Sequence, residues 1–223
     1  MTERIITAIK VQKRNSQRVN IDLDGEYAFG LSRLVAAWLN IGDRLSEEKI
    51  QSLLKKDAFE IAYQRALDLL NHRPRSEKEI RQRLTEKEFS VEQIDQVVEK
   101  LKLAGLIRDE NFARLWIDSR KEFHPRSKTL LRYELKNKGI AEEHIDAALE
   151  ELPADQELAS LAASNYIRRL QGNDWETFRK RLSGYLSRRG FSYGTVAPLV
   201  KELWLQQGAS IVQSNNDNEE LEK

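Results

Sequence analysis

The first thirty residues alternate apolar and polar positions with a period of two, the spacing of half-buried strands. The pair Asp24-Gly25 favours the positive φ angles of a tight hairpin turn. Alternating apolar residues lie on both sides of this pair: Val19, Ile21 and Leu23 before it, and Tyr27, Phe29 and Leu31 after it. The pattern predicts a small antiparallel sheet of about three strands over residues 4–31, followed by a short helix over 34–39.

From Ser46 onward the apolar period becomes that of a helix. Ser46 is a candidate N-cap, and Glu47 and Glu48 suit the positive end of a helix dipole. An apolar stripe then continues to Pro74, which ends it; its members are Ile50, Leu53, Leu54, Phe59, Ala62, Ala66, Leu69 and Leu70. We expect one lead-in helix over this stretch.

Two capping boxes follow, SEKE at 76–79 and SVEQ at 90–93. They predict helices that run to about residues 87 and 103. Gly105 suits a left-handed C-cap, and Asp109 suits the cap of a further helix.

The chain repeats itself with a shift of 51 residues and no gap. Pro-Arg-Ser occurs at 74–76 and again at 125–127, and Leu84, Leu135 and Leu186 fall at equivalent positions. Each copy resembles a three-helix unit, and stacked copies would bury the faces that one unit leaves open.

The resulting fold class is mainly α: tandem three-helix repeats in a curved array, with a small N-terminal antiparallel β segment. We predict five segments: a β-rich segment over 1–45, repeat one with its lead-in helix over 46–105, repeat two over 106–153, repeat three over 154–205, and a disordered acidic tail over 206–223.

Composition supports a helical protein and narrows its setting. Apolar residues make up 40% of the chain and charged residues 33%, with only four prolines. Cysteine is absent, which excludes disulfides and thiolate metal sites and suits a reducing compartment. The sequence has neither an apolar run of membrane-spanning length nor the apolar core of a signal peptide. We therefore expect a cytoplasmic protein that does not enter a membrane.

The sequence carries no recognisable catalytic motif. His72, His124 and His144 do not have metal-ligand spacing, and acid pairs such as Glu142-Glu143 suit a solvated helix face. We therefore expect a monomeric non-enzyme that binds no metal and no cofactor.

Charge is distributed unevenly although the net charge is only +1. Residues 120–138 and 165–191 each carry a surplus of five positive charges, whereas 139–157 carry seven acids and no Lys or Arg. The candidate partner- or polyanion-binding residues are Arg75, Arg81, Arg126, Lys128, Arg132, Tyr133, Arg168, Arg169, Arg179, Lys180, Arg181, Arg188 and Arg189. Such cations on the second helix of each repeat suit a polyanion or an acidic protein surface.

Acids interleave the cations of the first repeat, which favours a salt-bridged solvent face there. In repeats two and three the cation surplus favours a binding role. Of the aromatic residues among these cations, we expect only Tyr133 and Tyr193 to be exposed, and Trp175 and Tyr185 to belong to the core. A three-helix unit with a basic helix is also typical of helix-turn-helix proteins, so direct binding of single- or double-stranded DNA is the competing hypothesis.

The stretches RPRSEKEIRQRL, GLIRDENFARLWIDSR, LKNKGI and LSRRGFSYGTV resemble the RecX family of bacterial recombination regulators, over about 55–205. The first strands resemble an N-terminal extension of some members. The resemblance implies a non-enzymatic protein of recombination, DNA repair and the SOS response that binds the RecA filament and inhibits its ATPase and strand exchange. One departure is Glu88, where the other repeats have Gly139 and Gly190, so the turn of the first repeat is expected to differ.

Overall fold

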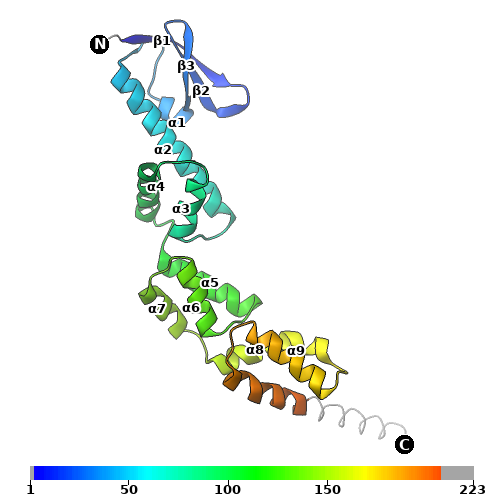
Figure 1. Ribbon diagram of the computed structural model, residues 1–223. Helices are drawn as coiled ribbons and strands as arrows, with labels where there is room; N and C mark the ends of the chain where they lie inside the picture. The colour runs from blue at the N-terminus through cyan, green and yellow to red at the C-terminus, as the bar shows by residue number, and fades with distance from the viewer. Residues whose placement is uncertain (1–2, 207–223) are drawn as a thin grey trace, which may run out of the picture. The chain divides into compact units, whose positions relative to one another are not determined.

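The computed structural model describes residues 3–206 (Figure 1). The chain forms two compact units, divided between Arg108 and Asp109. The fold is mainly α, with tandem three-helix units and an N-terminal antiparallel sheet, as predicted. Of the predicted tail over 206–223, only Gln206 is described, and it is helical; the rest lies outside the described residues. The expected curvature of the repeats stays a prediction.

The sheet has four antiparallel strands in the order β3-β2-β1-β4. The strands are β1 (Arg4–Gln12), β2 (Asn15–Leu23), β3 (Glu26–Ser32) and the two-residue β4 (Arg44–Leu45). Asp24 and Gly25 have φ angles of 53° and 94°, which confirms the predicted turn. The short edge strand β4 was not predicted, because two residues carry no alternation.

A β-bulge corrects the expected face of one strand residue. Ile21 pairs with Phe29 but Asp22 pairs with Tyr27, so Ala28 is an extra residue in β3. Because an extra residue reverses the alternation of faces, Tyr27 is 64% exposed while Phe29 and Leu31 are buried.

Two helices follow the sheet. Helix α1 (Arg33–Ala36) is shorter than predicted, whereas α2 (Glu47–His72) begins after Ser46, whose side chain accepts a hydrogen bond from the Lys49 N–H. The first part of α2 joins the core of the sheet through Ile50 and Leu53. Its second part supplies Ala62 and Ala66 to the core of repeat one, so α2 leads from the sheet to the first repeat (Figure 1).

A buried carboxylate in the middle of α2 ties this helix to the sheet. Asp57 is 4% exposed; one oxygen accepts a hydrogen bond from the Ser32 N–H at 2.5 Å, and the other pairs with Arg18 at 2.8 Å. The same guanidinium group donates to the Gly30 carbonyl at 3.1 Å. Asp57 therefore holds the end of β3 against α2, a role that the sequence did not indicate.

Repeat one is completed by α3 (Glu77–Thr85) and α4 (Val91–Leu103). Both capping boxes are formed, and Gly105 has a φ of 68°, as predicted. The third helix of the repeat therefore ends at a left-handed residue.

The second unit holds repeats two and three. Repeat two consists of α5 (Asp109–Phe123), α6 (Lys128–Asn137) and α7 (Glu142–Glu150). Repeat three consists of α8 (Asp155–Ile167), the 3-10 turn η1 (Arg168–Leu170), α9 (Trp175–Ser187) and helical residues 193–206. Asp109 is the first residue of α5 rather than the residue before it.

The predicted core positions of the repeats are confirmed. Leu84, Leu135 and Leu186 are 1%, 0% and 0% exposed. Leu135 and Leu186 belong to one continuous apolar core that the second and third repeats share. The gap-free register of the sequence repeat therefore matches equivalent buried sites.

The turn after the second helix is the same in all three repeats, contrary to the expectation for repeat one. Glu88, Gly139 and Gly190 have φ angles of 64°, 81° and 84°. In each turn the next residue donates to a carbonyl five residues back, from Phe89 to Leu84 at 3.3 Å in repeat one and by the equivalent bonds in the others. Glu88 thus adopts the left-handed conformation that a glycine adopts more easily.

Candidate partner interface

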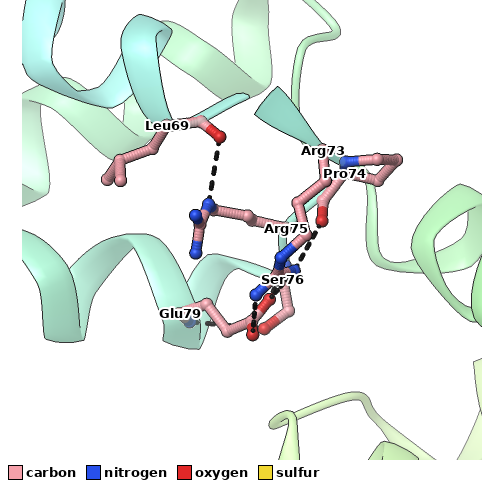
Figure 2. Close-up of polar contacts among 6 residues, drawn as sticks. All are labelled: Leu69, Arg73, Pro74, Arg75, Ser76 and Glu79. Carbon is pink, nitrogen blue, oxygen red and sulfur yellow. Dashed lines mark hydrogen bonds and ion pairs between the residues drawn. The ribbon is translucent and has the colours of Figure 1, made fainter. Parts of the chain in front are cut away.

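Two arginines, Arg73 and Arg75, hold the Pro-Arg-Ser turn of repeat one by hydrogen bonds to neighbouring residues (Figure 2). Arg75 donates from Nε to the Leu69 carbonyl at 3.0 Å, which ties the second helix to the end of α2. Arg73 forms two bonds with Glu79, at 2.8 and 3.1 Å. Burial lowers the pKa of the Arg75 guanidinium, and the neighbouring Arg73 lowers it further. Arg75 is therefore committed to the fold of the turn.

One ion pair joins the second and third helices in both of the first two repeats. Arg81 contacts Asp95 at 2.5 Å, and Arg132 contacts Asp146 at 2.6 Å, at positions related by the repeat. These hydrogen bonds raise the pKa of both guanidinium groups. In repeat three the corresponding positions are Ser183 and Ala197, so the pair is absent there. The sequence predicted both arginines to bind a partner or polyanion. In the structure each already pairs with carboxylates of its own repeat.

Arg126 belongs to a half-buried cluster around Glu134. The Glu134 carboxylate accepts hydrogen bonds from Trp116 Nε1 at 2.8 Å and Arg120 Nε at 3.0 Å, and it is in ion-pair contact with Arg126. Its side chain is only 11% exposed. Sequence analysis did not single out Glu134, although it is the one acid within the basic α6. Arg126 is thus neutralised inside repeat two.

The N-terminus of α6 is the junction between repeats two and three. The Ser127 N–H donates to the Arg189 carbonyl at 3.0 Å, and the Lys128 N–H donates to Asp155 Oδ1 at 2.9 Å. Gly190 lies so close that a Cβ atom there would be 2.6 Å from Ser127 Oγ. Lys128 therefore takes part in this junction through its backbone.

The Arg189 side chain also packs within the unit. Its guanidinium carbon lies 3.6 Å from the centroid of the Tyr185 ring, which stacks on Tyr166 at a centroid distance of 4.0 Å. Such stacking holds a cation by its attraction to the ring face. Arg189 is consequently half-buried.

The remaining candidate cations are all on repeat three, and they are exposed. They form no ion pair or side-chain hydrogen bond with any described residue; they are Arg168, Arg169, Arg179, Lys180, Arg181 and Arg188. Lys180, Arg181 and Arg188 line a shallow pocket of about 470 Å³ with Tyr166 at one side. Gly184 lies within its lining and adds no side chain, so the cations frame an open hollow. We call these six residues the repeat-three cation surface.

The aromatic expectations are mostly confirmed. Tyr133 and Tyr193 are 63% and 86% exposed, and Tyr185 packs against the core. Trp175, expected in the core, is 39% exposed and lies tilted against Trp204 at 5.5 Å between ring centroids. It is the first residue of α9.

Residues 3–206 contain no group of three His, Asp or Glu side chains placed to hold a metal ion. No helix within that range is both long and apolar enough to cross a membrane.

The architecture defines a tandem three-helix repeat protein with an N-terminal antiparallel sheet. Three family models match it in order: "Regulatory protein RecX N-terminal domain" at residues 4–46, "RecX, first three-helix domain" at 62–101 and "RecX, second three-helix domain" at 109–149. The chain belongs to the RecX family of regulatory proteins, which supports a regulatory role.

Individual relatives agree with this assignment. The chain is 34% identical to the regulatory protein RecX of Bacillus pumilus (strain SAFR-032), covering 89% of this chain and 77% of that protein. It is 30% identical to the RecX of Clostridium acetobutylicum (strain ATCC 824), with 92% and 98% covered. A crystal structure of regulatory protein RecX matches with a TM-score of 0.66 and 29% identity over 89% of this chain and 99% of the other. The crystal structure of RecX from Lactobacillus salivarius, at 22% identity and a TM-score of 0.55, covers 67% and 99% and shows the same fold.

Proposed function

We propose that this protein binds the filament of the RecA recombinase and inhibits its ATPase and strand-exchange activities. The observation that carries the proposal is the repeat-three cation surface, whose cations are exposed and have no described carboxylate partner. An acidic protein surface or a phosphate backbone held by the filament would neutralise them. The family assignment supports a regulatory rather than an enzymatic role.

The paired cations of the first two repeats have a different role in this proposal. Arg81, Arg126 and Arg132 already contact carboxylates, so binding through them would first break those contacts. We therefore place the partner contact on repeat three and assign these three arginines to the stability of their repeats. Tyr193, 86% exposed at the start of the last helix, is available to the same partner.

Direct action on DNA is the second candidate function. The exposed Tyr133 and Tyr193 favour it, since bases stack on aromatic side chains beside arginine. The acid-rich α7 opposes it: the exposed Glu143 and Glu150, which form no ion pair with a described Lys or Arg, would repel a phosphate backbone lying across this helix.

The test is the DNA-dependent ATPase of RecA with the protein added. We expect inhibition by the wild-type chain and its loss in the double reversal Arg181→Glu with Arg188→Glu. The matched control is Lys78→Glu with Lys87→Glu, two exposed cations of repeat one, which should inhibit as the wild type does. An unchanged ATPase rate at saturating wild-type protein would disprove the proposal.

A further inference from the structure

A second unexplained surface lies in the first unit, along α2. Two adjoining hollows of about 980 and 610 Å³ share Val35 and Lys56 in their linings. One is lined from α2 and α4, through Phe59 and Leu103, and the other from α1 through Leu34 and from the turn after α1 through Trp38. We call the surface formed by these six residues the α2 groove.

The groove exposes large apolar side chains to solvent. Trp38 is 88% exposed, Leu103 80% and Leu34 64%. A tryptophan and two leucines along two adjoining hollows form more apolar surface than scattered single residues would. Tryptophan is also the residue type most enriched among the energetic anchors of protein interfaces. These side chains therefore indicate a partner with apolar groups of its own.

The charges of the groove are mainly positive. Lys49, Lys55 and Lys56 on α2 and Arg44 on β4 form no ion pair with any residue in the described range 3–206. Four acids also line the groove, and three of them have partners within the same unit. Asp43 accepts from the Asn40 N–H at 2.8 Å, Glu60 accepts from Gln64 at 2.9 Å, and Asp95 pairs with Arg81 at 2.5 Å. The donors to Asp43 and Glu60 are neutral, so these two acids and the exposed Glu99 keep their negative charge. The cations without an ion pair in the described range still outnumber them, because Lys100 adds to the four named above, and the resulting positive surplus makes the groove complementary to a negatively charged partner.

The combination of aliphatic anchors and a lysine rim distinguishes a protein partner from a nucleic acid. Trp38 could stack on a base, but Leu34, Val35 and Leu103 offer aliphatic contacts that bases do not use for stacking. The groove is lined mostly from helices, and an amphipathic helix packs well into such a trough. Its apolar side chains would meet Trp38 and Leu103 while its acids meet Lys49, Lys55 and Lys56.

We propose that the α2 groove is the docking site for an acidic amphipathic helix of a partner protein. The inference goes beyond the proposed function, because the groove lies wholly in the first unit and does not use the repeat-three cation surface. The groove would serve as a second point of attachment with its own specificity for apolar side chains.

The absence of cysteine makes a direct binding test possible in the full chain. Gln96→Cys creates a single thiol at an exposed position in the lining of the larger hollow, to which an environment-sensitive fluorophore can be attached. The probe is a synthetic helical peptide with leucines at positions i, i+3 and i+7 and glutamates elsewhere. We expect a saturable change in fluorescence, and affinity weakened roughly 30-fold by Trp38→Ala, the effect of losing an interface anchor. Lys56→Glu should also weaken binding.

Matched variants and probes decide the outcome. Tyr27→Ala removes an exposed aromatic residue outside the groove, and Lys78→Glu reverses an exposed lysine on α3; both should bind the peptide as the wild type does. The proposal is overturned if the same leucine peptide with lysines in place of glutamates binds equally well. It is also overturned if a single-stranded oligonucleotide competes for the labelled site, or if sedimentation shows dimers that Trp38→Ala abolishes. The probe of this test is a peptide rather than RecA, so its failure to bind would not affect the RecA proposal. Likewise, an unchanged RecA ATPase rate would not affect the proposal for the α2 groove.

Discussion

At the scale of single residues, side chains of one type serve different purposes depending on their partners. Arg75 donates to a carbonyl and Arg81 to a carboxylate, whereas Arg181 has no described partner. Glu88 is the residue with the clearest conformational strain, because it adopts a φ of 64° where the other repeats have glycine.

We predict that Glu88→Gly stabilises the protein by about 0.5–1 kcal/mol, since glycine tolerates the left-handed region that costs other residues about 1–2 kcal/mol. Urea unfolding of the two proteins measures the difference. The reverse comparison is Gly190→Ala, which adds both a strained φ and a Cβ atom 2.6 Å from Ser127 Oγ. It should therefore cost more than Gly172→Ala, where φ is 76° and an added Cβ atom would meet nothing within 4 Å, and equal losses would contradict the close contact between repeats.

A buried leucine tests the register of the repeat. Leu135 is 0% exposed in the core of the second unit, so Leu135→Ala should cost about 2–5 kcal/mol in the free energy of unfolding. The exposed Leu115 is the control, and its change to alanine should cost less than about 0.5 kcal/mol. A small loss at Leu135 would show that the shift of 51 residues does not align the core.

At the scale of elements, the second helix is joined to the third by equivalent ion pairs in the first two repeats. Repeats one and two use the Arg81–Asp95 and Arg132–Asp146 pairs to hold the second helix against the third. Helix α2 is held against the sheet in a similar way by Asp57. This carboxylate is far more buried than Asp95 or Asp146.

We expect these two kinds of ion pair to differ in strength. Asp57→Ala should destabilise the protein by about 3–5 kcal/mol, because it leaves Arg18 and the Ser32 N–H without their buried partner. Asp146→Ala should cost about 1 kcal/mol or less, because that pair is largely exposed to solvent. Thermal unfolding monitored by circular dichroism separates them, and similar losses for both would mean that burial does not set the difference.

At the scale of the whole molecule, the net charge of +1 hides a local surplus, because the six exposed candidate cations without a described partner all lie in repeat three. Long-range attraction depends on such local surpluses rather than on the total. The proposed RecA-binding and DNA-binding functions differ in how this surface would respond to salt.

If the repeat-three cation surface mainly binds free DNA, reversing Arg181 and Arg188 should flatten the log–log dependence of affinity on salt by about two phosphate equivalents, each about 0.7 for a single strand. We expect instead weak binding to free DNA, with the same reversals abolishing inhibition of preformed RecA filaments. Fluorescence anisotropy at several salt concentrations, beside the ATPase assay, distinguishes the two. Tight DNA binding without RecA, accounting for all the inhibition, would establish the alternative.

Local patterns in the sequence were sufficient for most of the fold. The hairpin at Asp24-Gly25, the capping boxes at Ser76 and Ser90 and the core leucines of the repeat depend on residues close in the chain or on a regular period, and the structure confirms them. The bulge that turns Tyr27 outward and the left-handed Glu88 were missed, because in both cases tertiary packing overrides a local preference.

The sequence by itself determined the helical repeat, the sheet and the positions of the cations, because periodicity and charge are properties of the chain. It left open which cations are unpaired. Arg126 and Arg132 look like Arg181 in the sequence, yet Glu134 and Asp146 neutralise the first two once the helices pack. The α2 groove likewise depends on α1, α2 and α4 meeting in space. Only the tertiary structure decided these features, because an ion pair or a hollow forms between residues that folding brings together from distant parts of the chain.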